Sequence, residues 1–247
     1  MQNEQRGEQE QAQLQDDART DIQVEAPRFI QYLFFKLDPA WRRLPEEERS
    51  RGKRDLIQVV EESADSVRTF TYSTLGLKVD ADLMLWRNAS SLDDLQEMLS
   101  QVLKTGLGAY LQATYSLFGL TRPSQYTKRR TTQEQAIDEK DRLRYLTVYP
   151  FSKTTEWYLM SREARQGMMN EHMRVGHDYA EVRQVLVYAT GLDDQEFVVA
   201  YETDDLHQYQ GLLIALRSTE SRRYTLKDQP IFTCIHRPIH EVLDLLG

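Results

Sequence analysis

The sequence predicts an α+β protein made of two β-α-β-β-α-β units that follow each other along the chain. Two observations lead to this fold class. Strand-like and helix-like segments alternate in the same order in residues 27–121 and 143–247, with a polar stretch between them. Apolar residues make up 40 % of the 247 residues, which is enough for a large core. We therefore expect two ferredoxin-like halves whose antiparallel sheets pack face to face or close into a barrel.

The first unit combines four strands with two helices. Its strands are predicted from β-branched and aromatic residues in alternating patterns, at 29–37, 67–75, 81–89 and 113–121. One helix, 45–63, starts with a proline and an acidic first turn, a typical helix beginning. The other, 91–106, starts at Ser91, whose hydroxyl can cap it.

The second unit repeats this order. Its predicted strands span 143–151, 182–190, 196–204 and 230–236. Ser161 can cap a helix over 161–173, and leucines at heptad-like spacing predict another helix over 204–220.

Two segments outside the units are polar. Residues 1–26 are dominated by glutamine and glutamate, so we expect a disordered tail that cannot bury enough apolar surface to fold. Residues 122–142 show no apolar periodicity and are predicted to form a linker.

Composition excludes several classes of function. The chain has 31 basic and 39 acidic residues, and this net charge of −8 argues against nucleic acid as a partner. The single cysteine, Cys234, excludes an intrachain disulfide and a cysteine-based zinc site. No apolar run approaches the roughly 20 residues of a membrane span. The N-terminus lacks the pattern of a secretory signal, so we expect a cytoplasmic protein.

One of the five histidines stands out. His172 lies near the end of the predicted helix 161–173, four residues after Met168, which places the imidazole on the apolar face. Such a side chain can be an ordinary core histidine. It can also be the single axial ligand of a haem iron, which needs one neutral imidazole in an apolar wall.

The segment Tyr149–Tyr158 (YPFSKTTEWY) precedes this helix and brings a phenol, an ammonium and an indole near it. These side chains can simply fill the end of a strand. Beside a redox cofactor, however, an aromatic cluster can carry a radical, and a lysine can hold a propionate.

Five segments together resemble the chlorite dismutase family, which includes the coproheme decarboxylases: YPFSKTTEWY, MMNEHMRVGHDY, VYATGLDDQEFVVAYETDDL, LRSTESRRYT and PIFTCI. The resemblance runs from about Arg28 to the C-terminus. It implies a dimeric α+β barrel within each subunit, a haem in the C-terminal half and a homopentamer.

The resemblance also implies roles for single residues. His172 matches the ligand of the haem iron, and Glu220 matches a carboxylate that hydrogen-bonds this imidazole in part of the family. Lys153 and Trp157 match the lysine and tryptophan beside the haem propionates.

Two tyrosines match family positions as well. Tyr149 matches the tyrosine that becomes a radical in coproheme decarboxylases. Tyr115 falls where a pocket tyrosine near a propionate is expected.

The position above the iron divides the family. Chlorite-degrading members carry an arginine there, and in this chain the position falls on Gln184, directly after Arg183. Because neighbouring strand residues point to opposite faces, only one of the two can face the haem. Glutamine there resembles the coproheme decarboxylases.

The resemblance thus implies an enzyme that converts coproheme III to haem b with hydrogen peroxide, with Tyr149, Lys153 and Gln184 at the reacting centre. Coproheme III is then both substrate and cofactor. Two alternatives are a chlorite dismutase that releases chloride and dioxygen, and a non-catalytic haem-binding protein.

Overall fold

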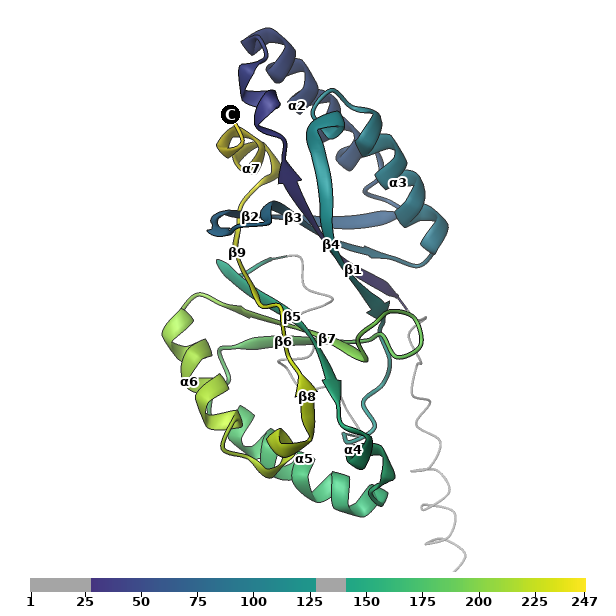
Figure 1. The fold of residues 1–247 in the computed structure, drawn as a ribbon, viewed down its shortest axis with the longest axis vertical. Helices are drawn as coiled ribbons and strands as arrows, with labels where there is room; N and C mark the ends of the chain where they lie inside the picture. Colours follow the sequence, from purple (N-terminus) through teal and green to yellow (C-terminus); the bar gives the residue numbers. More distant parts are fainter. Residues whose placement is uncertain (1–27, 128–140) are drawn as a thin grey trace, which may run out of the picture.

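Nine β-strands and the helices that cover them occupy residues 28–127 and 141–247, which are the parts of the chain that this computed structural model describes (Figure 1). The predicted tail, 1–26, and residues 128–140 of the predicted linker lie outside the described residues.

The first half contains four strands and two α-helices in the predicted order. Its elements are β1 (Phe29–Leu37), α2 (Glu46–Glu62), β2 (Val67–Lys78), β3 (Ala81–Ala89), α3 (Leu92–Lys104) and β4 (Leu111–Leu120), with short 3-10 turns at Pro39–Arg43 and Gly108–Tyr110. Hydrogen bonding arranges the strands as β4-β1-β3-β2. The Ser91 hydroxyl accepts a hydrogen bond from the N–H of Asp93, as a helix cap does.

The second half pairs its strands in the same relative order, β9-β5-β7-β6. Its elements are β5 (Tyr145–Lys153), α4 (Thr155–Leu159), α5 (Arg162–His177), β6 (Arg183–Tyr188), β7 (Phe197–Thr203), α6 (Leu206–Leu216), a 3-10 turn at Glu220–Tyr224, β8 (Thr225–Lys227), β9 (Phe232–His236) and α7 (Ile239–Leu245).

The two sheets close into one antiparallel barrel. Tyr72 and Ser73 of β2 pair with His236 and Ile235 of β9, and Leu120 of β4 pairs with Tyr188 of β6. The strands therefore follow one another in a ring. This outcome confirms the barrel alternative of the sequence prediction and excludes two separate stacked sheets.

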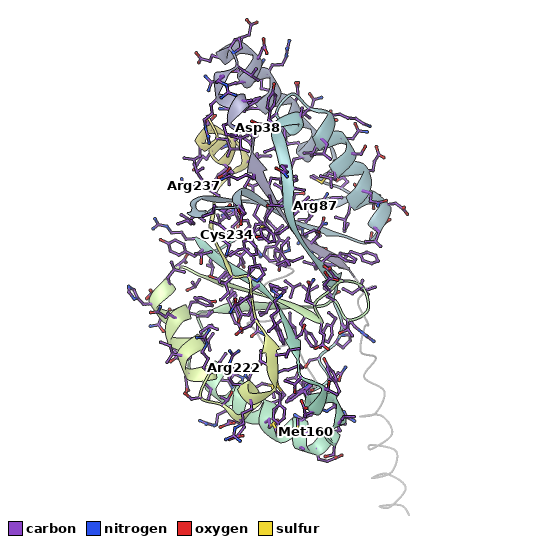
Figure 2. The ribbon with its side chains drawn as sticks, viewed as in Figure 1. Asp38, Arg87, Met160, Arg222, Cys234 and Arg237 are labelled. Carbon is purple, nitrogen blue, oxygen red and sulfur yellow. The ribbon has the colours of Figure 1, made fainter. Side chains whose placement is uncertain are left out.

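The interior of the barrel is an apolar core supplied by both halves. Phe34 of β1 stacks on Phe232 of β9 with ring centroids 4.0 Å apart, and Trp86 and Val187 belong to the same cluster. Cys234 lies in this cluster, near the middle of the molecule in Figure 2. Its burial raises the pKa of the thiol, as expected for an inert core cysteine.

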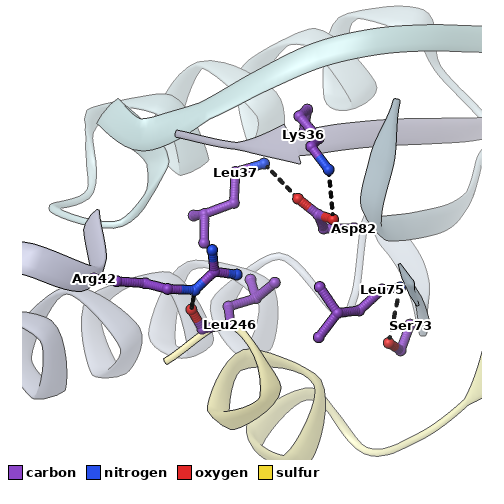
Figure 3. Close-up of polar contacts among 7 residues, drawn as sticks. All are labelled: Lys36, Leu37, Arg42, Ser73, Leu75, Asp82 and Leu246. Carbon is purple, nitrogen blue, oxygen red and sulfur yellow. Dashed lines mark hydrogen bonds and ion pairs between the residues drawn. The ribbon is translucent and has the colours of Figure 1, made fainter. Parts of the chain in front are cut away.

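The outer face of the first half is filled by its own helices and by the C-terminal helix. Strand alternation turns Phe35 and Leu83 outward, where they pack with Leu56 of α2 and Val242 of α7. Arg42 Nε donates a hydrogen bond to the Leu246 carbonyl at 3.1 Å, which ties α7 to this half (Figure 3).

Asp82 of β3 reinforces the same region. Its carboxylate accepts from Lys36 Nζ at 2.9 Å and from the Leu37 N–H at 3.0 Å (Figure 3). These contacts tie β1 to β3 in the outer layer of the first half.

Three elements of the second half were not predicted. The helix α5 continues four residues beyond 173, and α4, β8 and α7 were missed altogether. α4 has five residues, β8 three and α7 seven, so none is long enough to show a reliable hydrophobic period.

Candidate functional site

A cavity with two lobes lies between the outer face of the second-half sheet and helices α5 and α6. The tyrosine lobe, which contains Tyr149 and Tyr201, has a volume of about 150 Å³. The tryptophan lobe, which contains Trp157, has a volume of about 330 Å³. Both lobes are lined by Phe151, Lys153, Met169, His172, Gln184, Leu186 and Leu216. The lobes therefore meet at His172, with Gln184 supplied by the sheet.

His172 points into the cavity from α5. The helix starts at Ser161, whose Oγ accepts from the Ala164 N–H, so the predicted cap is present. The imidazole Nδ1 lies 3.4 Å from Ser221 Oγ. Burial, with a smaller effect of Lys153, lowers the pKa of His172 to about 4. The ring is neutral at pH 7, which is the form that ligates a metal.

Glu220 does not accompany His172, contrary to the prediction. Its carboxylate lies 3.3 Å from Arg223 Nε and its side chain is 57 % exposed. The next residue, Ser221, is buried beside the imidazole instead. Successive residues of a 3-10 turn point about 120° apart, so only one of this pair can face α5.

Tyr149 is the middle residue of β5, on the face opposite Leu146 and Val148, and the strand continues to Lys153. Leu146 and Val148 fill the barrel, whereas Tyr149 lines the tyrosine lobe and is 7 % exposed. Its ring stacks on Tyr201 with centroids 6.3 Å apart. Burial, together with Tyr201, raises the pKa of Tyr149, so its hydroxyl keeps its proton at neutral pH.

Lys153 lies where the two lobes join. Its Nζ donates to the Ser221 carbonyl at 3.2 Å and lies 4.5 Å above the Trp157 ring. Burial, with a smaller effect of Arg222, lowers the pKa of Lys153 to about 8. The ammonium is thus held ready for an acidic ligand but loses its charge more easily than a surface lysine.

Glu196 holds the junction of β5 and α4, a role that the sequence did not suggest. Its Oε2 accepts from the Lys153 N–H at 2.6 Å and from the Tyr158 hydroxyl at 2.7 Å. This carboxylate fixes the backbone from which Lys153 and Trp157 extend.

The pKa of Lys153 predicts how an acidic porphyrin binds at different pH. A ligand carboxylate favours the charged ammonium and raises its pKa, so binding takes up a proton above about pH 8. We expect coproporphyrin III to bind several-fold more weakly at about pH 9.5 than at about pH 7. Fluorescence titration measures this difference. The Lys153→Met variant should show the same affinity at both pH values, and a wild-type affinity that does not change would contradict the prediction.

The two neighbouring residues of β6 point to opposite sides. Gln184 lines both lobes. Arg183 instead donates from Nη1 to the Asp141 carbonyl at 3.1 Å and lines neither lobe. The strand register therefore presents an amide, not a guanidinium, to the space above His172.

Tyr115 lies outside the cavity, contrary to the prediction. Its ring packs edge-on against Phe232 at 4.9 Å, and its hydroxyl lies 3.3 Å from Asp80 Oδ2. β4 pairs with β6 at Leu120 and Tyr188, and Tyr115, five residues earlier in β4, packs against the barrel core instead of lining the cavity.

Besides Lys153, four arginines line the cavity, and sequence reasoning missed them. Arg217 and Arg222 line the tyrosine lobe, where Arg222 Nη1 pairs with Asp228 Oδ2 at 2.6 Å; Figure 2 labels Arg222. Arg122 and Arg165 line the tryptophan lobe. These arginines lie in or near turns and helix ends, so no hydrophobic periodicity in the sequence showed which way their side chains point. A ligand with acidic groups on two edges suits this distribution.

The residues present fit an iron porphyrin. No group of three or more metal-binding side chains occurs within residues 28–127 and 141–247. A lone neutral imidazole suits a metal whose remaining ligands come from a macrocycle. Phe151, Leu186 and Leu216 supply apolar walls, and the cations of both lobes can meet the acidic side chains.

No helix in the described parts of the chain is long and apolar enough to cross a membrane.

Comparison with known proteins places these residues in context. The sequence model of the family described as chlorite dismutase matches residues 49–237. A coproheme decarboxylase from Mycolicibacterium smegmatis is 36 % identical over 163 residues, which cover 66 % of this chain and 70 % of that protein.

Solved structures show the same fold. A chlorite dismutase from Candidatus Nitrospira defluvii in complex with imidazole is 27 % identical, with a TM-score of 0.82 over 93 % of this chain and 98 % of that one. A doubly substituted variant from the same organism is 28 % identical, with a TM-score of 0.81 over 88 % of this chain and 94 % of that one.

Proposed function

Because this chain belongs to the chlorite dismutase family, we propose that it binds an iron porphyrin through His172 and uses hydrogen peroxide to convert coproheme III to haem b. One observation carries the proposal. His172, Tyr149 and Lys153 line a single cavity, and the strand opposite the imidazole presents Gln184. A protein that only stored haem would need His172 but neither the phenol nor the ammonium.

His172 would hold the iron through Nε2, because Nδ1 faces Ser221. A hydrogen bond at Nδ1 orients the ring and fixes its tautomer. The bound iron porphyrin would supply, with peroxide, the oxidant that tyrosine oxidation needs.

Tyr149 would transfer this oxidation to the substrate. Its hydroxyl gives up one electron and one proton, and the resulting phenoxyl oxygen takes a hydrogen atom from a propionate side chain. Loss of a second electron then releases carbon dioxide and leaves a vinyl group. Each decarboxylation thus takes two electrons from one propionate and reduces one hydrogen peroxide to two waters. Two peroxides convert coproheme III to haem b, and the product of the first step still carries three propionates.

Lys153 would position the reacting propionate. Its ammonium already lies among oxygen acceptors, the Ser221 carbonyl and Thr225 Oγ1, and can exchange these for a carboxylate. With its pKa lowered to about 8, it can also pass a proton to solvent or peroxide near neutral pH.

Gln184 favours decarboxylation over chlorite degradation. A chlorite anion is held best by a fixed positive charge, which an amide lacks. The arginine that could supply such a charge, Arg183, lies on the other face of β6.

The purified chain loaded with ferric coproporphyrin III and titrated with hydrogen peroxide tests the function. We expect mass spectrometry to show loss of one and then two carbon dioxide units, with haem b as the end product. With chlorite, we expect no sustained dioxygen release. Unchanged coproheme would contradict the decarboxylase, and rapid dioxygen release from chlorite would support a chlorite dismutase instead.

Several finer parts of the sequence prediction belong to this proposal. We infer that residues 27–121 and 143–247 are ferredoxin-like repeats joined by the linker 122–142. We also expect a homopentamer in the cytoplasm.

A further inference from the structure

We propose that Arg165 binds a carboxylate at the second edge of the porphyrin and thereby selects porphyrins with four acidic side chains over those with two. The inference rests on the proposed porphyrin ligand of His172. It concerns Arg165 and Thr127 of the tryptophan lobe, which have no part in the reaction described above.

Helix geometry places Arg165 on the same face of α5 as His172. The two residues are seven positions apart, which is nearly two full turns and about 10 Å along the helix axis. Both side chains line the tryptophan lobe, as does Met169 between them. The edge of a porphyrin held at His172 would therefore lie near Arg165, and the acidic side chains of a porphyrin are on that edge.

The Arg165 guanidinium has an unused donor. Its Nε is buried and has no hydrogen-bond partner among the residues that the structure describes. Thr127 Oγ1, which lines the same lobe, is also buried without a partner in those parts of the chain. Buried donors without acceptors are costly, so this pair indicates an acceptor supplied by a ligand.

The cations of the tyrosine lobe contrast with Arg165. Arg222 is paired with Asp228, and Lys153 donates to the Ser221 carbonyl. A planar guanidinium with an unpartnered Nε matches a carboxylate, which it can bind with two parallel hydrogen bonds. The lobe therefore suits an acidic group better than a neutral one.

The distribution of cations explains how the chain can distinguish its ligands. A porphyrin with acids on one edge can turn that edge toward Lys153 and Arg222, and so avoids Arg165. A porphyrin with four acids must place some of them in each lobe. Loss of Arg165 is therefore expected to weaken binding of the four-acid porphyrin more than binding of the two-acid porphyrin.

Binding of metal-free porphyrins tests this inference without turnover. Coproporphyrin III carries four propionates, and mesoporphyrin IX has ethyl groups in place of two of them. We expect Arg165→Met to raise the Kd of coproporphyrin III roughly tenfold or more, and that of mesoporphyrin IX less than about threefold. Fluorescence quenching gives both constants, and circular dichroism checks the fold of each variant.

Two further variants complete the design. Arg162→Met removes the same charge from an exposed position of the same helix, outside the cavity, and should leave both Kd values unchanged. Arg165→Lys keeps the charge without the planar fork and should fall between wild type and Arg165→Met. An equal loss for both porphyrins, or no loss for coproporphyrin III, would overturn the proposal. Neither result depends on whether the loaded chain decarboxylates coproheme.

Discussion

Replacing His172 by alanine is expected to abolish the histidine-ligated spectrum of the iron porphyrin and to reduce peroxide-dependent turnover by several orders of magnitude. The imidazole is neutral at pH 7 because burial lowers its pKa to about 4, and it lies where both lobes meet. His172 is the only histidine among the described residues that line both lobes. Absorption and resonance Raman spectroscopy measure the loss directly.

His177 provides the matched control. It lies on the same helix and lines only the tryptophan lobe, at an exposed position. His177→Ala should keep the spectrum. Metal-free coproporphyrin III, which makes no iron bond, should bind His172→Ala nearly as well as wild type. A normal iron spectrum in His172→Ala would remove this residue as the ligand.

Replacing Tyr149 by phenylalanine is expected to stop decarboxylation almost completely while binding survives. The substitution keeps the ring that stacks on Tyr201 and removes only the hydroxyl, so the loss of binding should be about 1 kcal/mol. Without a phenolic hydrogen, no oxidised oxygen forms near the propionate. Coproheme with all four propionates should be recovered by mass spectrometry.

Tyr201→Phe is the control for Tyr149. It removes the neighbouring hydroxyl in the same lobe and leaves Tyr149 intact, so most turnover should remain. Conversion of coproheme at the wild-type rate by Tyr149→Phe would refute the radical role. Loss of turnover in Tyr201→Phe while Tyr149→Phe stays active would refute it as well.

Local sequence patterns correctly predicted features that depend on a single strand or helix. β1 and β3 have the predicted bounds, because aromatic and β-branched runs end at clear polar turns. Alternation along β6 also predicted that only one of Arg183 and Gln184 faces the cavity. Local patterns could not decide between stacked sheets and a closed barrel, since closure depends on seams of one and two residue pairs.

Site residues were predicted less well where irregular segments place them. The family resemblance implied Glu220 beside His172, but the 3-10 turn presents Ser221. Arg165 was overlooked because the helix face was defined by Met168, whereas the structure turns Met169 into the cavity. Tyr115 matches a family position near a haem propionate, but its side chain packs on Phe232 in the barrel core and does not line the cavity.

The shared barrel interior has a thermodynamic consequence. Phe34 and Phe232, from opposite halves, stack inside one core, so neither half can bury its inner face alone. The two halves should therefore unfold in a single cooperative transition. A porphyrin present at a hundred times its Kd adds about 2.7 kcal/mol to the unfolding free energy. The first half would gain this stabilisation although only the second half and the start of the linker line the cavity.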